Sequence, residues 1–218
     1  MRRFRNAIVY IVMIPMMYIV SSCIEITQDI VINADKSGKF SLKIDLGMLQ
    51  FANMNSLQGT SGMMKNLQGI PPMAVEKLSG MKGITGIENL TNEESGLYGF
   101  SFHFDNDKSF NKAIYQFAEQ QKFFFMPDYI KIKKKKVNIT DISPFIKKAN
   151  AMSEKQSAES FISSQISDYI KVTTQLFLPR PVRDTRNLRS KVENQQVTLT
   201  ATMSELIKGI DYGNTVKY

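Results

Sequence analysis

The chain has 218 residues, with 28 Lys and Arg against 20 Asp and Glu, a net charge of +8, 43% hydrophobic residues, one Cys, one His and no Trp. A disulfide-stapled domain needs an even number of cysteines and a zinc site usually needs several Cys or His, so both classes are excluded in their usual forms. A histidine-dependent catalytic triad would rest on His103 alone. The composition is that of a folded chain, and the length suits one domain or two small ones.

The first 22 residues have the three regions of a secretory signal peptide. Arg2, Arg3 and Arg5 precede an apolar run from Ala7 to Val20, and small residues follow it. This run is shorter than the roughly 20 apolar residues that a membrane-spanning helix needs. Three of the 28 basic residues belong to the segment, which leaves a net charge of +5 for the rest of the chain. We therefore expect residues 1–22 to be a signal peptide and 23–218 to be the mature domain.

The only cysteine of the chain stands at the end of Val20-Ser21-Ser22-Cys23. This sequence resembles a bacterial lipobox, in which an aliphatic residue and two small residues precede a cysteine. The resemblance implies that the Cys23 thiol carries a diacylglyceryl group, that signal peptidase II cuts before Cys23, and that the new amino terminus is acylated. Acyl chains contribute about 0.8 kcal/mol per buried CH₂, so three of them would anchor the protein stably. The alternative is an uncleaved anchor helix in which Cys23 is incidental.

The lipobox resemblance also implies a location. The residue after the cysteine is Ile24, not the Asp that retains such lipoproteins in the inner membrane. We therefore expect a lipoprotein of the cell envelope, most simply in the outer membrane and facing the periplasm. A nucleic-acid partner is not expected in that compartment.

Alternating apolar and polar residues predict two β-hairpins. The first has strands near 24–33 and 40–46, with a turn cluster at 34–38 that contains Gly38. No linker separates it from Cys23, so the folded body should sit close to the membrane. The second has strands at 84–90 and 97–104, and places three Phe side chains on one face and His103 on the other. His103 is therefore read as a solvated or cross-strand-paired residue.

Residues 47–86 form a Met- and Gly-rich insertion with helical patches expected at 47–57 and 72–79, the second after Pro71-Pro72. The favoured interpretation is a loosely packed helix pair over a sheet. An alternative is a flexible lid for an apolar ligand, because Met side chains adapt to irregular surfaces. The lid residues would be Met48, Met54, Met63, Met64 and Met73. Copper(I) binding is disfavoured, because these methionines are not tightly clustered and no His accompanies them.

An amphipathic helix is predicted at 107–121, followed by β-rich sequence at 129–141 that four lysines interrupt: Lys133, Lys134, Lys135 and Lys136. The apolar residues on the two sides of the lysines differ in parity, so the lysines form a turn or a bulge shifts the register. The favoured reading of the run is a solvated edge that blocks aggregation. The functional alternative is contact with anionic lipid headgroups.

The rest of the chain predicts a helical stretch at 143–165, a strand at 170–178 ended by Pro179, a strand at 197–203 and a short helix at 204–210. Between the two strands, arginines recur at every third position: Arg180, Arg183, Arg186 and Arg189. An exposed basic loop is favoured over an anion-binding ribbon.

The element order predicts an α+β fold with a mainly antiparallel sheet built from hairpins and helices packed on one face. The arrangement is similar to the LppM-type domain of other bacterial lipoproteins, a resemblance that implies no activity. The leading hypothesis is a lipid-anchored, non-catalytic envelope protein that binds a partner protein or an apolar ligand such as a lipid, without a cofactor. The alternative is an envelope hydrolase that uses carboxylates, for which the adjacent pair Glu93-Glu94 has poor geometry.

Overall fold

The computed structural model describes residues 24–47, 60–117, 127–147 and 167–218, with side chains in the first helix described from residue 68 onward. The elements are β1 (Ile24–Ile32), β2 (Gly38–Asp45), α2 (Thr60–Leu78), β3 (Ile84–Asn89), η3 (Glu93–Ser95), β4 (Leu97–Phe104), α3 (Asp107–Phe117), β5 (Ile130–Lys133), β6 (Lys136–Ile139), β7 (Ile170–Phe177), β8 (Asp184–Thr185), β9 (Lys191–Glu193), β10 (Gln196–Thr202), α6 (Met203–Ile207) and β11 (Asn214–Lys217). A further helical turn covers 143–147.

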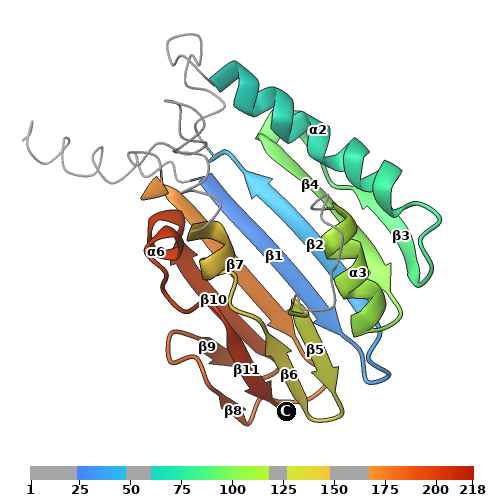
Figure 1. Ribbon diagram of the computed structural model, residues 1–218, viewed down its shortest axis with the longest axis vertical. Coiled ribbons are helices and arrows are strands. Elements are labelled where there is room, and N and C mark those ends of the chain that lie inside the picture. Colours follow the sequence, from blue (N-terminus) through green and yellow to red (C-terminus); the bar gives the residue numbers. More distant parts are fainter. Residues whose placement is uncertain (1–23, 48–59, 118–126, 148–166) are drawn as a thin grey trace, which may run out of the picture.

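The fold is α+β, with two sheets (Figure 1). The seven-stranded sheet has the order β3-β4-β2-β1-β7-β10-β9, and the four-stranded sheet has the order β5-β6-β11-β8. Neighbouring strands are antiparallel except for β1 and β7, which run parallel. The prediction of a mainly antiparallel α+β fold is confirmed, and both predicted hairpins are present.

One face of the large sheet carries the core. The buried side chains on this face form two adjoining clusters. One cluster contains Ile24 and Ile170 at one end of the sheet, and the other contains Ile32 and Leu176 at the opposite end. The helices α2 and α3 and the small sheet lie over this face (Figure 1). Phe100, Phe102 and Phe104 of β4 face it as predicted.

The opposite face of the large sheet is polar. Cross-strand ion pairs join Lys43 to Asp29 at 2.8 Å and Lys171 to Glu25 at 3.1 Å. Threonines lie beside them on the neighbouring strands, and Thr173 donates a hydrogen bond to Glu25. Because these side chains satisfy one another, this face has the character of a solvated surface.

Helix α2 corrects one prediction. It begins at Thr60 and runs through Pro71 and Pro72, which were expected to mark its start. Proline removes one backbone donor and costs helix stability. Ile70, Ala74 and Leu78 stand four residues apart and all pack on the core, with the last two fully buried, so tertiary contacts hold the helix on both sides of the prolines. Most of the helix expected at 47–57 lies outside the described residues.

Candidate functional site

The predicted anchor point is Cys23, and it lies outside the described residues together with Val20, Ser21 and Ser22. The next residue, Ile24, is already buried and begins β1. This strand has a neighbour on each side, β2 and β7. The chain that follows Cys23 therefore enters the middle of the large sheet without a linker. Among the described helices, none is long and apolar enough to cross a membrane.

The methionines predicted as a lid are placed only in part. Met48 and Met54 lie outside the described residues, and Met63 and Met64 belong to α2, where their side chains are not described. Met73 is half-buried on the same helix. Where side chains are described, α2 packs directly into the core through Ala74 and Leu78. The lid hypothesis is therefore untested.

The lysine run forms a tight turn between two strands of the small sheet. Lys133 ends β5 and faces Lys136, which begins β6, while Lys134 and Lys135 make the two-residue connection. This confirms the turn and removes the register shift that a bulge would need, because Ile130, Ile132, Val137 and Ile139 all point inward. Lys133, Lys134 and Lys135 are exposed. No carboxylate in the described part of the chain forms an ion pair with any of the four lysines.

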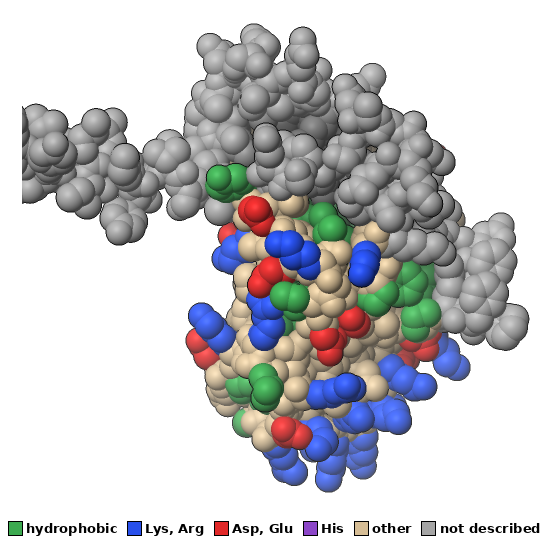
Figure 2. Space-filling model, turned by 60° about the vertical axis from the view of Figure 1, so that its left-hand side comes forward, with side chains coloured by type: hydrophobic (Ala, Val, Ile, Leu, Met, Phe, Trp, Pro, Cys, Tyr) green, Lys and Arg blue, Asp and Glu red, His purple; other side chains and the backbone are tan. Residues whose placement is uncertain are grey.

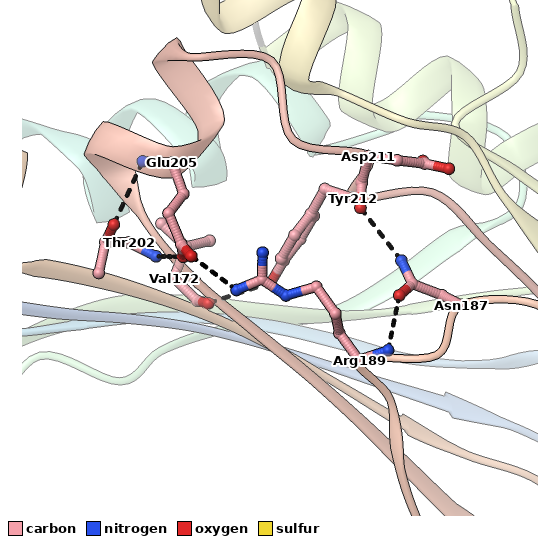
Figure 3. Close-up of polar contacts among 7 residues, drawn as sticks. All are labelled: Val172, Asn187, Arg189, Thr202, Glu205, Asp211 and Tyr212. Atoms are coloured by element: carbon pink, nitrogen blue, oxygen red, sulfur yellow. Dashed lines mark hydrogen bonds and ion pairs between the residues drawn. The ribbon is translucent and has the colours of Figure 1, made fainter.

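The four periodic arginines separate into two groups. Arg189 binds Glu205 at 2.8 Å, and the second Glu205 oxygen accepts from the Thr202 backbone at 2.8 Å (Figure 3). The Thr202 hydroxyl in turn accepts from the Glu205 backbone, which completes a capping box on α6. These contacts, the Thr202 N–H first, hold the pKa of Glu205 below its usual range. Arg189 is thus a structural residue.

The other arginines follow the edge of the small sheet. The backbone N–H of Arg183 donates to Lys217 at 2.8 Å, and that of Arg186 donates to Thr215 at 3.0 Å. Both accepting residues are on β11. The side chains of Arg180, Arg183 and Arg186 are exposed. The four arginines therefore do not form a uniform anion-binding ribbon in this described segment, because Arg189 is paired with Glu205.

The C-terminal strand joins the lysine turn to the arginines. In β11, Lys217 stands opposite Lys136 on one side and Asp184 on the other. The Tyr218 N–H donates to Lys135 at 3.2 Å, and its hydroxyl donates to Lys133 at 3.1 Å. Arg180 is close enough to the Tyr218 hydroxyl to act on it electrostatically. We call the seven cations at this end of the molecule the cationic end: Lys133, Lys134, Lys135, Lys136, Arg180, Arg183 and Lys217.

The cationic end lies at the lower end of the molecule, where Figure 2 shows Lys and Arg side chains gathered. The acidic groups nearby are Asp184, which pairs with Lys217 at 2.8 Å, and Glu193 on the adjoining β9. The sequence indicated the lysine run and the arginines separately but did not connect them. The contribution of Lys217 was missed, because the last residues of the chain carry no clear strand pattern.

The cationic end and the first described residue lie at opposite ends of the large sheet. In the parallel pair, Ile24 is opposite Ile170 and Val31 is opposite Phe177, and Arg180 follows three residues later. A nine-residue strand such as β1 is about 30 Å long. The chain after Cys23 therefore enters the fold about that far from the cations.

The residues considered for catalysis do not form a constellation in the described structure. His103 is exposed on β4, and Glu93 and Glu94 lie exposed in η3. Glu88 accepts from Lys39 and from Ser101, and these two contacts lower the pKa of its carboxyl. No group of three possible metal-binding side chains occurs among the residues described.

A cavity between the two sheets is small. It measures about 10 Å³ and is lined by Ile139, Thr174, Leu176, Val197, Leu199, Tyr212 and Asn214. A space of that size corresponds to about one water molecule. The Tyr212 hydroxyl lies 3.1 Å from the Val172 carbonyl and 3.0 Å from the Leu199 carbonyl. This cavity is too small for a lipid or another organic ligand.

No protein-family model matches the chain, and no curated protein matches it. Among solved structures, the chain is similar to the NMR structure of the folded domain of the Mycobacterium tuberculosis protein LppM. The TM-score is 0.41 and the identity is 8%, with 90% of each chain covered. A similarity at this level assigns neither a family nor a function.

Proposed function

We propose that the protein is a lipid-anchored, non-catalytic binding protein of the bacterial cell envelope, held to its membrane through Cys23. The observation that carries the proposal is the entry of the chain into the fold. Ile24 is buried at the start of β1, between two neighbouring strands, immediately after the cysteine of the lipobox-like sequence. A lipid on Cys23 would therefore hold the folded body directly at the membrane.

Binding through an exposed surface is favoured over an enclosed apolar ligand. The cavity between the sheets has room for about one water, and the described part of α2 is packed on the core. The cationic end gathers seven cations, and among the described residues its lysines have no carboxylate partner apart from the pair of Lys217 with Asp184. Placement in the outer membrane, facing the periplasm, belongs to the same proposal.

The test is metabolic labelling with palmitate in cells that express the protein or its Cys23→Ala variant. The native chain should take up label and be cleaved to the mature length, whereas the variant should remain an unlabelled precursor. A Cys23→Ala protein that is still labelled would overturn the proposal. Density-gradient separation of inner and outer membranes then tests the location.

A further inference from the structure

The cationic end combines residues from three separate parts of the sequence on one convex tip. The turn at Lys134 and Lys135 supplies its centre, the segment after β7 supplies Arg180 and Arg183, and β11 supplies Lys217. Tyr218 joins β11 to the turn through its bonds to Lys133 and Lys135, and the Arg183 N–H joins the segment after β7 to β11 through its bond to the Lys217 carbonyl. The cations therefore move with the folded body as one group.

The surroundings of these cations suit a flat anionic surface. They stand on a hairpin tip, where Figure 2 shows a projecting lower end with blue side chains directed outward. The aromatic residue in contact with the turn, Tyr218, is buried and offers no face on which a nucleic-acid base could stack. Lysine acts as a flexible point charge, which fits the diffuse charge of a lipid surface better than a single shaped pocket.

The proposed anchor decides which anionic surface is within reach. Cys23 would hold one end of β1 at the membrane, and the cationic end lies about 30 Å away along the strand. A tethered group meets the headgroups of its own membrane at a high effective concentration, whereas a soluble partner must arrive by diffusion. Both ends can touch one flat bilayer only when the strands lie along it.

We infer that the cationic end binds the anionic headgroups of the membrane that holds the Cys23 anchor, so that the strands of the large sheet lie parallel to the bilayer surface. This inference rests on the proposed function, because it requires the lipid on Cys23. It adds a second attachment point and an orientation. On a neutral bilayer the same protein is held by its anchor alone, and the cationic end is free to leave the surface.

The test measures the distance of the far end from the bilayer in the full lipidated protein. A Gln195→Cys variant carries a donor dye, because Gln195 is exposed on the turn between β9 and β10 at the cationic end. Cys23 is the only native cysteine, and its sulfur is blocked by the lipid, so the dye attaches to a single thiol. Acceptor lipids mark the surface of vesicles made of phosphatidylcholine alone or with phosphatidylglycerol.

Energy transfer should be higher on the phosphatidylglycerol vesicles, and added salt should lower it. Lys134→Gln with Lys135→Gln should lower the ratio of surface-bound to free tips about 30-fold, the effect expected for two lysines near an anionic surface. The matched control is Lys147→Gln with Lys208→Gln. This control variant also loses two positive charges. Lys147 and Lys208 are exposed and lie near each other beside α6, at the Ile24 end of the sheet.

Equal energy transfer on both kinds of vesicle would overturn the inference. The inference would also be overturned if the variant at Lys147 and Lys208 abolished the effect of phosphatidylglycerol while the variant at Lys134 and Lys135 left it intact. The contact with the bilayer would then lie at the anchor end. Binding of an acidic polypeptide to the turn without any response to lipid charge would assign the tip to a protein partner instead. Failure of the proposed function has another signature, since the protein would leave the vesicle fraction in both lipid mixtures.

Discussion

Tyr218 closes the small sheet over the lysine turn, with its hydroxyl donating to the Lys133 carbonyl at 3.1 Å. The ring is buried, and Val216 beside it in β11 is fully buried as well. The position of the exposed lysines therefore depends on the buried side chain of Tyr218. This arrangement explains how a run of four like charges can occupy a defined place in the fold.

Replacing the Tyr218 side chain should loosen this end. Tyr218→Ala removes a buried ring and its hydrogen bond, and should lower the free energy of unfolding by about 3 kcal/mol. Urea denaturation followed by circular dichroism measures the loss. The comparison variant is Asp184→Asn, which breaks an ion pair that is exposed on both partners and should therefore change the stability far less. Equal losses in the two variants would show that Tyr218 does not hold the tip in place.

A second prediction concerns the joint between α3 and the small sheet. Asn111 is buried, and its amide group donates to the Ile130 carbonyl at 2.7 Å and accepts from the Ile130 N–H at 3.0 Å. Asn111→Ala would leave both backbone groups of Ile130 without partners in a dry environment. We expect a loss of about 2–4 kcal/mol in unfolding free energy, since each buried unpaired group costs about 1–3 kcal/mol.

The matched control lies on the same helix. Gln116→Ala truncates an exposed side chain of α3 and should change the unfolding free energy by less than about 0.5 kcal/mol. Thermal and urea unfolding of the two variants in parallel tests the difference. If Asn111→Ala unfolds like the control, the bond to Ile130 does not stabilise the docking of the hairpin.

The lid hypothesis for the Met-rich segment needs a test of its own, because the residues that carry it are mostly outside the described structure. If Met48, Met54, Met63, Met64 and Met73 cover an apolar site, native mass spectrometry should detect phospholipid retained by the protein or taken up when it is added. Such a complex should weaken when Met73, half-buried on α2, is replaced by Gln. A protein that never takes up lipid would favour simple packing of the segment.

The local pattern of the sequence was enough to predict the hairpins. The alternation in β1, β2 and β4 is regular, and the turn clusters lie where the strands end. What it did not predict depends on contacts between distant segments. The parallel pairing of β1 with β7 joins residues about 146 positions apart, as in the bond from Lys171 to Glu25. A periodic pattern carries no information on such partners.

The same limit applies to the candidate site. The lysine run and the arginines are both visible as sequence motifs, yet only β11 brings them together, and its four residues are too short for a recognisable alternation. Helix α2 shows the converse effect, where a strong local signal at Pro71-Pro72 is overridden by packing. Arg189 fits the arginine period but binds Glu205 because α6 presents that carboxylate to it.

The last prediction concerns pH and the buried hydroxyl of Tyr212. Burial raises the pKa of Tyr212 to about 12, against an ordinary value of 10. Between pH 10 and pH 12 the folded state therefore keeps the Tyr212 proton while the unfolded state loses it. The stabilisation of the folded state by the neutral Tyr212 hydroxyl is fully present below pH 10 and is lost as the pH rises from about 10 to about 12. Over that window the loss should approach about 3 kcal/mol.

The variant Tyr212→Phe removes this contribution. It removes the hydroxyl that contacts the Val172 and Leu199 carbonyls and should cost about 1–3 kcal/mol at pH 8. Its stability should then fall less steeply than that of the native protein between pH 10 and 12, as measured by urea unfolding at several pH values. Burial also raises the pKa of Tyr129, and Tyr212 adds a smaller rise that the Tyr212→Phe change removes, so the difference between the two pH curves includes this coupling. Parallel pH curves for the two proteins would mean that Tyr212 ionises as readily when folded as when unfolded.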